Sequence, residues 1–239
     1  MAEPAGAGAP GTGASGAAGG GRDLPGTGRT EAFSDGVFAI VITLLVLDLV
    51  SPAYRAGDLG AALLHEWPAY LAFAVSFVYV GVIWLNHHAL FRHVGRMSPG
   101  FSWINLGVLF GAVIIPFPTV VVASAFAHGD HGDERAAVVL YASAAVLMSC
   151  TWLAAFGYLR RHPALLTAGT TAGYARQQLA RPVTGIGLYA VSGLVGWLAS
   201  PVAGVVLIAV MIAYHAITSE GLYEGPLGRL ARHPGGPDD

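Results

Sequence analysis

Six long apolar segments restrict the fold of this chain more than any other feature of its sequence. They lie at about 31–50, 67–90, 101–127, 136–159, 178–198 and 201–219. A helix needs roughly 20 apolar residues to cross a bilayer, and a lipid-embedded segment must be helical to pair its own backbone groups. Hydrophobic residues make up 54% of the chain and charged residues only 11%, a balance typical of polytopic membrane proteins. The sequence therefore predicts an all-α integral membrane protein with six transmembrane helices.

The distribution of arginine predicts the orientation of these helices. All twelve basic residues are arginine, and only Arg55 and Arg135 lie on one side of the expected membrane. The other ten lie in or beside the N-terminal tail, the second and fourth connections and the C-terminal tail. Cytoplasmic connections carry an excess of positive charge. We therefore expect both termini to be cytoplasmic, in a multi-pass protein of the cell (plasma) membrane.

Composition divides the chain into three regions. Residues 1–28 are mostly Ala, Gly, Pro and Thr and lack an apolar core, so we expect a disordered cytoplasmic tail. This tail also lacks the apolar stretch of a signal peptide. Residues 29–220 are expected to form the six-helix transmembrane domain, and 221–239 a cytoplasmic C-terminal tail.

Several classes of function are disfavoured. The net charge of −2, without a basic stripe, argues against a nucleic-acid partner. No nucleophile motif, phosphate-binding glycine loop or cofactor fingerprint is present, so we expect neither an enzyme nor a bound cofactor. The adjacent His87 and His88 diverge by about 100° on a helix and are poorly spaced for a metal site. The one cysteine, Cys150, is expected to be a small buried apolar residue.

The first apolar segment carries an aspartate near each end. Twelve residues separate Asp35 from Asp48, and Thr43 is the one polar side chain among them. At about 1.5 Å per helical residue they span about 18 Å, well short of the ~30 Å hydrocarbon core. Either the carboxylates lie in protein or water inside the membrane, or this helix is not an ordinary lipid-facing span. An ionisable side chain at such a depth indicates a functional site.

Polar side chains from three helix ends are expected to meet at the cytoplasmic end of the bundle. They are Arg29, Ser34 and Asp35 of the first segment, Asn86, His87 and His88 of the second, and Trp103 and Asn105 of the third. A buried carboxylate needs a partner, because an unpaired charge in an apolar environment is costly. The histidines, Asn105 and Arg29 are the candidate partners of Asp35. We interpret the group as a structural polar clasp between helices, with a catalytic site as the alternative.

An apolar stripe runs along the first segment. At about 100° per residue, Ile40, Leu44 and Leu47 fall within about 60° of one another, with Thr43 and Asp48 at the margins. The stripe is either a packing surface or a constriction with water at both ends, of the kind that gates pores by dewetting. One helix cannot enclose a pore, so a constriction requires several subunits around an axis.

Two further patterns concern helix packing. Pro116 and Pro118 in the third segment remove backbone donors, so this helix should kink or locally unwind, either as a tolerated proline or as a hinge. Small residues in the fifth and sixth segments predict close helix approach. They are Gly185, Gly187, Ser192, Gly193, Gly196 and Gly204.

A recognisable pattern of motifs extends over the first three segments. Arg29 precedes the runs FSDGVFAI and ITLLVLDL, the second segment ends in WLNHHALF, and the third begins with FSWINL. This pattern resembles the transmembrane protein 175 family of potassium channels over roughly residues 29–120. The resemblance implies the prokaryotic single-repeat type, in which four identical chains form a homotetramer and the first helix of each lines a central pore.

The resemblance also implies roles for individual residues. The pore constriction falls on Ile40, Leu44 and Leu47, and Thr43 matches a position linked to ion preference. Asp48 is expected near the outer mouth. The signature motif is implied to support the pore helix through contacts with the second and third helices. It comprises Arg29, Phe33, Ser34 and Asp35.

A potassium-conducting leak channel, with potassium ions as the permeant species and no cofactor, is the function we expect. One alternative is a proton-coupled secondary transporter that uses Asp35 with His87 or His88 as a relay. Another is a non-conducting membrane scaffold whose polar group only locks helices together.

Overall fold

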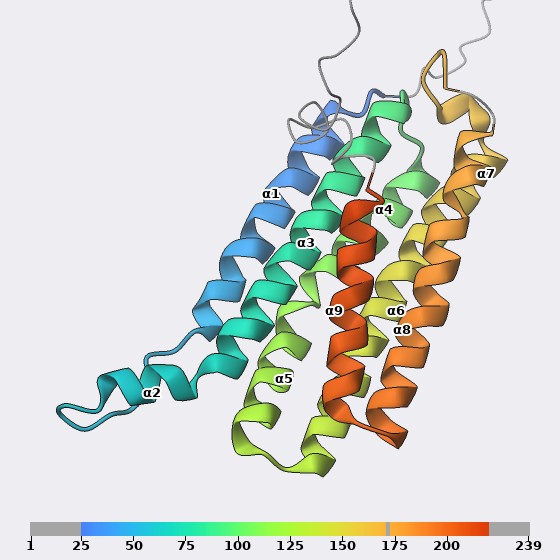
Figure 1. Ribbon diagram of the computed structural model, residues 1–239. Helices are drawn as coiled ribbons and strands as arrows, with labels where there is room; N and C mark the ends of the chain where they lie inside the picture. Colours follow the sequence, from blue (N-terminus) through green and yellow to red (C-terminus); the bar gives the residue numbers. More distant parts are fainter. Residues whose placement is uncertain (1–24, 171–172, 220–239) are drawn as a thin grey trace, which may run out of the picture.

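The computed structural model describes residues 25–170 and 173–219, which fold into an elongated bundle of helices (Figure 1). The main helices of this part of the chain are α1 (Gly28–Leu44), α3 (Trp67–His93), α4 (Pro99–Val113), α5 (Pro116–His128), α6 (His131–Arg161), α8 (Ala180–Leu198) and α9 (Pro201–Ile217). Shorter elements are the 3-10 helices η1 (Leu45–Asp48) and η2 (Pro163–Leu165) and the helices α2 (Leu59–His65) and α7 (Tyr174–Gln178). The all-α prediction is therefore confirmed for the described residues.

Five helical stretches are long and apolar enough to cross a membrane. They are Gly28–Asp48, Trp67–His93, Pro99–His128, His131–Arg161 and Tyr174–Leu198. The sixth apolar helix, α9, is shorter, at 17 residues. The chain is thus a multi-pass membrane protein with five candidate spans, and a sixth span through α9 stays a prediction.

Helix ends follow local capping chemistry. The side chain of Ser98 accepts a hydrogen bond from the backbone N–H of Phe101 at the start of α4, and Pro99 takes the first helical position. Asp130 caps α6 in the same way, and Ser200 caps α9. α5 ends at His128 and is capped by Gly129, whose positive φ of 73° is a conformation that glycine adopts without strain. These signals place the turns between successive spans.

The third span is broken at the predicted position. Regular α-helix stops at Val113 and resumes at Pro116, with Ile114 and Ile115 in a turn between α4 and α5. Proline has no backbone N–H to donate to the preceding turn, and its ring disfavours a continuous helix. The prediction that this segment kinks or locally unwinds is therefore confirmed.

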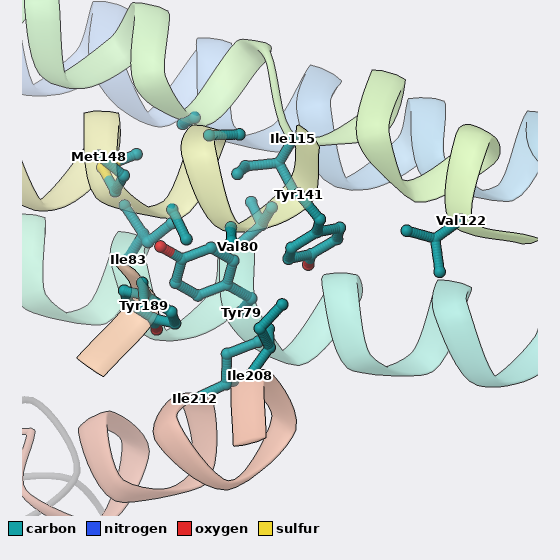
Figure 2. Packing of buried hydrophobic residues seen from close by; sticks show 14 of the residues in the cluster. Tyr79, Val80, Ile83, Ile115, Val122, Tyr141, Met148, Tyr189, Ile208 and Ile212 are labelled. Carbon is teal, nitrogen blue, oxygen red and sulfur yellow. The ribbon is translucent and has the colours of Figure 1, made fainter. Parts of the chain in front are cut away.

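α6 occupies the centre of the bundle and packs against α4, α5, α8 and α9. The core around it contains three large tyrosines, Tyr79, Tyr141 and Tyr189, together with branched aliphatic side chains (Figure 2). α8 and α9 approach closely because Gly196 and Gly204 face each other; a Cβ built on Gly204 would lie 2.7 Å from the Cα of Gly196. Close packing is therefore confirmed for these two glycines, whereas no atom lies within 4 Å of a Cβ built on Gly187.

Some expectations differ from the structure or lie outside it. Cys150 is exposed rather than buried. α2 was not anticipated, and it projects sideways at one end of the bundle, directly before α3 (Figure 1). The tails predicted at 1–28 and 221–239 fall almost wholly outside the described residues, which begin at 25 and end at 219.

Candidate functional site

α1 has two faces of different character. Its buried residues are Ser34, Phe38 and Val41, and Leu45 of η1 continues the same row. These positions recur every three or four residues, the spacing that brings side chains to one side of a helix. This face packs against α3 and α4. The packing of this row against α3 and α4 therefore determines which side of the helix is turned away from the bundle.

The predicted apolar stripe lies on the side turned away from the bundle. Ile40 is 60% exposed, Leu44 42% and Leu47 68%. Thr43 is exposed beside them, and its hydroxyl donates to the backbone oxygens of Ala39 and Ile40 at 3.0 and 2.9 Å. The stripe is thus not a packing surface within this chain, because the helix uses its opposite side for that purpose.

A chain of hydrogen bonds joins α1 to α4 and α3. The hydroxyl of Ser34 donates to the backbone oxygen of Thr30 at 2.8 Å and accepts from the Nδ2 atom of Asn105 at 3.1 Å. The Oδ1 atom of Asn105 lies 2.8 Å from Nε2 of His87. An amide oxygen only accepts, so His87 carries its proton on Nε2. We call Ser34, Asn105 and His87 the polar clasp.

Aromatic rings enclose the histidine of the polar clasp. The ring of Phe38 meets His87 edge-on at 5.2 Å, and Phe91 stacks on its other side at 4.7 Å. His87, Asn105 and Ser34 are all buried. A fully paired polar group inside an apolar core holds its helices in one arrangement, because any rotation would leave a donor or acceptor unpaired. The polar clasp therefore fixes the rotation of α1 about its own axis.

Asp35 has a partner that the sequence did not suggest. Its Oδ1 atom accepts a hydrogen bond from Nε1 of Trp84 at 2.9 Å, and the carboxylate is exposed. His88 is also exposed, with its ring 6.2 Å from that of Trp84. In the described part of the chain neither His87 nor His88 is hydrogen-bonded to Asp35, so the expected pairing is corrected to Trp84.

The sequence contains one feature that indicates the pairing of Asp35 with Trp84, the indole N–H of that tryptophan. Trp84 lies one helical turn before His87 and His88, at the depth expected for Asp35. An indole N–H only donates and usually finds an acceptor when partly buried. The predicted polar group at this end of the second segment comprised Asn86, His87 and His88 and did not include Trp84.

Besides Asp35 and His88, four predicted residues lie outside the polar clasp. Phe33 and Trp103 are exposed, the latter by 75%, and Arg29 is exposed as well. Asn86 donates to the backbone oxygen of Val82 and accepts from Ser219 at 3.1 Å, so it joins α3 to the end of α9 instead.

Asp48 ends η1 at the opposite end of the first span. It is half-buried, and its Oδ2 atom is buried without a hydrogen-bond partner among the described residues. A buried carboxylate oxygen of this kind requires a donor or a cation from elsewhere. Residues 25–170 and 173–219 contain no cluster of three His, Cys, Asp or Glu side chains that could hold a metal ion.

Comparison with known proteins adds to this geometry. A family model described as the endosomal/lysosomal potassium channel TMEM175 matches residues 29–116, which include the apolar stripe and the polar clasp. A crystal structure described as a lysosomal potassium-selective channel TMEM175 homologue from Chamaesiphon minutus has a TM-score of 0.69 and 32% identity. It covers 81% of this chain and 98% of that one. The chain belongs to the TMEM175 family.

Two relatives in the TMEM175 family are named after different ions. A protein of Streptomyces collinus, named a potassium channel, is 42% identical over 136 residues, or 56% of this chain and 65% of the relative. The mouse protein named endosomal/lysosomal proton channel TMEM175 is 37% identical over 129 residues, or 48% of this chain and 26% of the relative. The chain thus matches less than two thirds of each of these relatives.

Proposed function

We propose that the chain forms a potassium-conducting leak channel, as a homotetramer with the first helix of each subunit lining a central pore. The observation that carries this proposal is the outward apolar stripe of α1. Ile40, Leu44 and Leu47 are exposed although the segment is long and apolar enough to span the membrane. The crystal structure from Chamaesiphon minutus, described as potassium-selective, supports the same function.

The stripe supplies a hydrophobic constriction when four copies surround an axis. Apolar rings in a narrow pore exclude water and limit ion flow, whereas carboxylates at a mouth concentrate cations. We assign the constriction to Ile40, Leu44 and Leu47 and ion preference to Thr43, and place Asp48 at the outer mouth. The unpartnered Oδ2 atom of Asp48 is consistent with a partner outside the single chain. Potassium is the permeant ion, and no cofactor takes part.

The polar clasp keeps the stripe turned toward the axis. Ser34, Asn105 and His87 fix α1 against α4 and α3, so the side of α1 that faces the pore cannot change without breaking buried hydrogen bonds. The remaining motif residues, Arg29 and Phe33, are exposed, as is Trp103. We assign these three to contacts with a neighbouring subunit.

The proposed topology has six spans, and both termini lie in the cytoplasm. The channel lies in the plasma membrane. α9 supplies the sixth span, because its 17 residues equal the shortest helices that cross a bilayer, about 17 residues. An even number of spans returns the chain to the side where it started, which agrees with the arginine-rich tails and connections.

Planar-bilayer recording of the purified protein, with potassium on one side and sodium on the other, tests this function. We expect a steady current whose reversal potential shifts toward the potassium equilibrium potential. Current without such a shift would reject potassium preference, and a flux that saturates and couples to a second ion would reject a channel.

A proton pathway is the second candidate, because the mouse relative is named a proton channel. The exposed carboxylate of Asp35 follows Ser34 of the polar clasp in sequence, but His87 is bonded to Asn105 rather than to Asp35. A proton-coupled transporter predicts that Asp35→Asn abolishes pH-driven uptake into vesicles while the protein still assembles. The absence of both flux and current under every cation gradient would favour a scaffold.

A further inference from the structure

A cavity of about 340 Å³ lies among α3, α5, α6 and α9, at the end of the bundle where α5 joins α6. Its lining residues include Leu71, Ala72, Ser76, Glu134, Tyr141 and Val202. Figure 2 shows three lining residues on different helices, with Val122 on α5, Tyr141 on α6 and Ile208 on α9. The cavity is separate from the outward face of α1 and within the size range of small-molecule sites, roughly 300–1,000 Å³.

The cavity opens sideways between two helices. Leu71 on α3 and Val202 and Val206 on α9 line it and are also exposed on the outside of the bundle. Because these apolar side chains are exposed on the bundle, an occupant from the bilayer can reach the cavity between them. Trp67 and Val202 stand near the starts of their helices, which places the opening near the membrane surface.

The inner end of the cavity has no unpaired polar group. The hydroxyl of Ser76 lies 2.9 Å from that of Tyr141 and 2.7 Å from that of Thr119, which donates to the backbone oxygen of Ile115. Ser76 lies nine residues into α3, about 13 Å from its start at 1.5 Å per residue. With these hydroxyls paired to one another, the deep part of the cavity suits a hydrocarbon.

The outer end holds a buried carboxylate. The side chain of Glu134 is only 10% exposed and lies in the first turn of α6, where the helix dipole favours negative charge. Its Oε2 atom lies 2.9 Å from Nδ1 of His131, whose side chain is 84% exposed and outside the lining. Glu134 is the one acidic residue among the lining residues. The cavity therefore combines one carboxylate at its mouth with an apolar interior.

We propose that this cavity is a binding site for a lipophilic monoammonium ion, with its ammonium group on Glu134 and its hydrocarbon chain directed toward Ser76 and Tyr141. A buried carboxylate favours a cation, and the apolar walls favour an alkyl chain. The orientation matches that of an amphiphilic amine in a bilayer, which keeps its charge at the surface and its chain in the core. Such a ligand enters the cavity between α3 and α9 without turning over.

Thermal unfolding of the full chain in detergent, with octylammonium or the neutral n-octanol of equal chain length, tests this site. A ligand that binds only the folded protein raises the Tm in proportion to its affinity. We expect octylammonium to bind the wild type about tenfold or more tightly than n-octanol does, because of the charge-assisted contact with Glu134.

Two variants in the same helical turn separate a specific contact from general negative charge. Glu134→Gln should remove the preference for octylammonium while leaving the weak effect of n-octanol. Asp133→Asn is the matched control, because Asp133 is exposed and outside the lining. If Asp133→Asn weakened octylammonium as much as Glu134→Gln, or if neither did, the site would be rejected.

A second pair of variants tests the cavity itself. Ala72→Phe fills the cavity and should weaken both ligands, whereas Ala74→Phe, exposed on the same helix and outside the lining, should weaken neither. Unchanged binding to Ala72→Phe would place the ligand elsewhere and overturn the proposal. If this variant did not fold, the comparison of Glu134→Gln with Asp133→Asn would still decide. Neither pair depends on ion conduction, so the result is independent of the proposed channel.

Discussion

At the scale of single residues, Asn105 joins two helices to a third. Its amide donates to Ser34 and accepts from His87, and both contacts are buried. Truncating Ser34 and Asn105 to alanine, singly and together, should give a coupling free energy of about 0.5–1.5 kcal/mol in unfolding measurements in detergent, the range for polar contacts between membrane helices.

Ser102 supplies the control for this cycle. It lies one turn before Asn105 on α4 and hydrogen-bonds the backbone oxygen of Ser98 instead. The pair Ser102→Ala and Asn105→Ala should show no coupling beyond about 0.3–0.5 kcal/mol. Equal coupling in both pairs would mean that the effect is general to α4 and not specific to the polar clasp.

Ile40 is the residue that tests the constriction most directly. Ile40→Asn places a hydrogen-bonding amide where the proposed pore is apolar, so water should enter and the single-channel current should rise. Val46→Asn adds the same amide to another exposed position of this span, on a different side of the helix, and should leave the current unchanged. A rise in both variants, or in neither, would contradict an Ile40 constriction.

Residue-level prediction from sequence succeeded for orientation and failed for pairing. Helical periodicity placed Ile40, Leu44 and Leu47 on one side of the first helix, where all three are exposed, and it separated His87, which is buried, from His88, which is exposed. The partner of Asp35 could not be read in this way. Which polar groups meet depends on the relative heights and rotations of α1 and α3, and these result from packing across the whole bundle.

At the scale of elements, the contact between α8 and α9 is a close helix approach that glycine makes possible. A Cβ on Gly204 would lie 2.7 Å from the Cα of Gly196 and 2.8 Å from Cγ1 of Val138. Backbone cannot move away as a flexible side chain can, so Gly204→Ala should force the helices apart. We expect a loss of about 1–3 kcal/mol of unfolding free energy, the usual cost of overpacking.

Gly187 on α8 is the matched control for Gly204. No atom lies within 4 Å of a Cβ built there, so Gly187→Ala should be neutral or stabilising by up to about 1 kcal/mol, the gain in helix propensity. Equal destabilisation in both variants, measured by thermal unfolding, would mean that neighbouring subunits or lipid, and not the α8–α9 contact, constrain these glycines.

Elements were predictable where a strong physical signal exists. Long apolar runs marked the spans, because a segment embedded in lipid must be helical to pair its backbone groups. Pro116 marked the break between α4 and α5, because proline lacks the backbone N–H that a continuous helix requires. α2 was missed. Its seven residues, Leu59–His65, combine small and apolar side chains without a spanning length or a clear period, so nothing distinguished this helix from a connection.

At the scale of the whole molecule, one chain leaves an apolar stripe on α1 that its own helices do not cover, and exposed apolar side chains also lie on α8. Exposure alone does not distinguish a surface that faces lipid from one that faces other subunits. The proposed tetramer makes the distinction, because it brings the four α1 stripes together at the axis and leaves much of α8 on the outside.

Cysteine cross-linking measures this difference. In a Cys150→Ser background, which removes the one native thiol, Leu47→Cys should form disulfide-linked dimers on oxidation in membranes, since thiols on neighbouring α1 helices come near the axis. Leu188→Cys, exposed on α8, should stay monomeric on a denaturing gel. If Leu188→Cys formed dimers and Leu47→Cys did not, α8 would be the subunit interface and the stripe would face lipid. A pore lined by α1 could not form in that arrangement, because the α1 helices of neighbouring subunits would not lie next to one another.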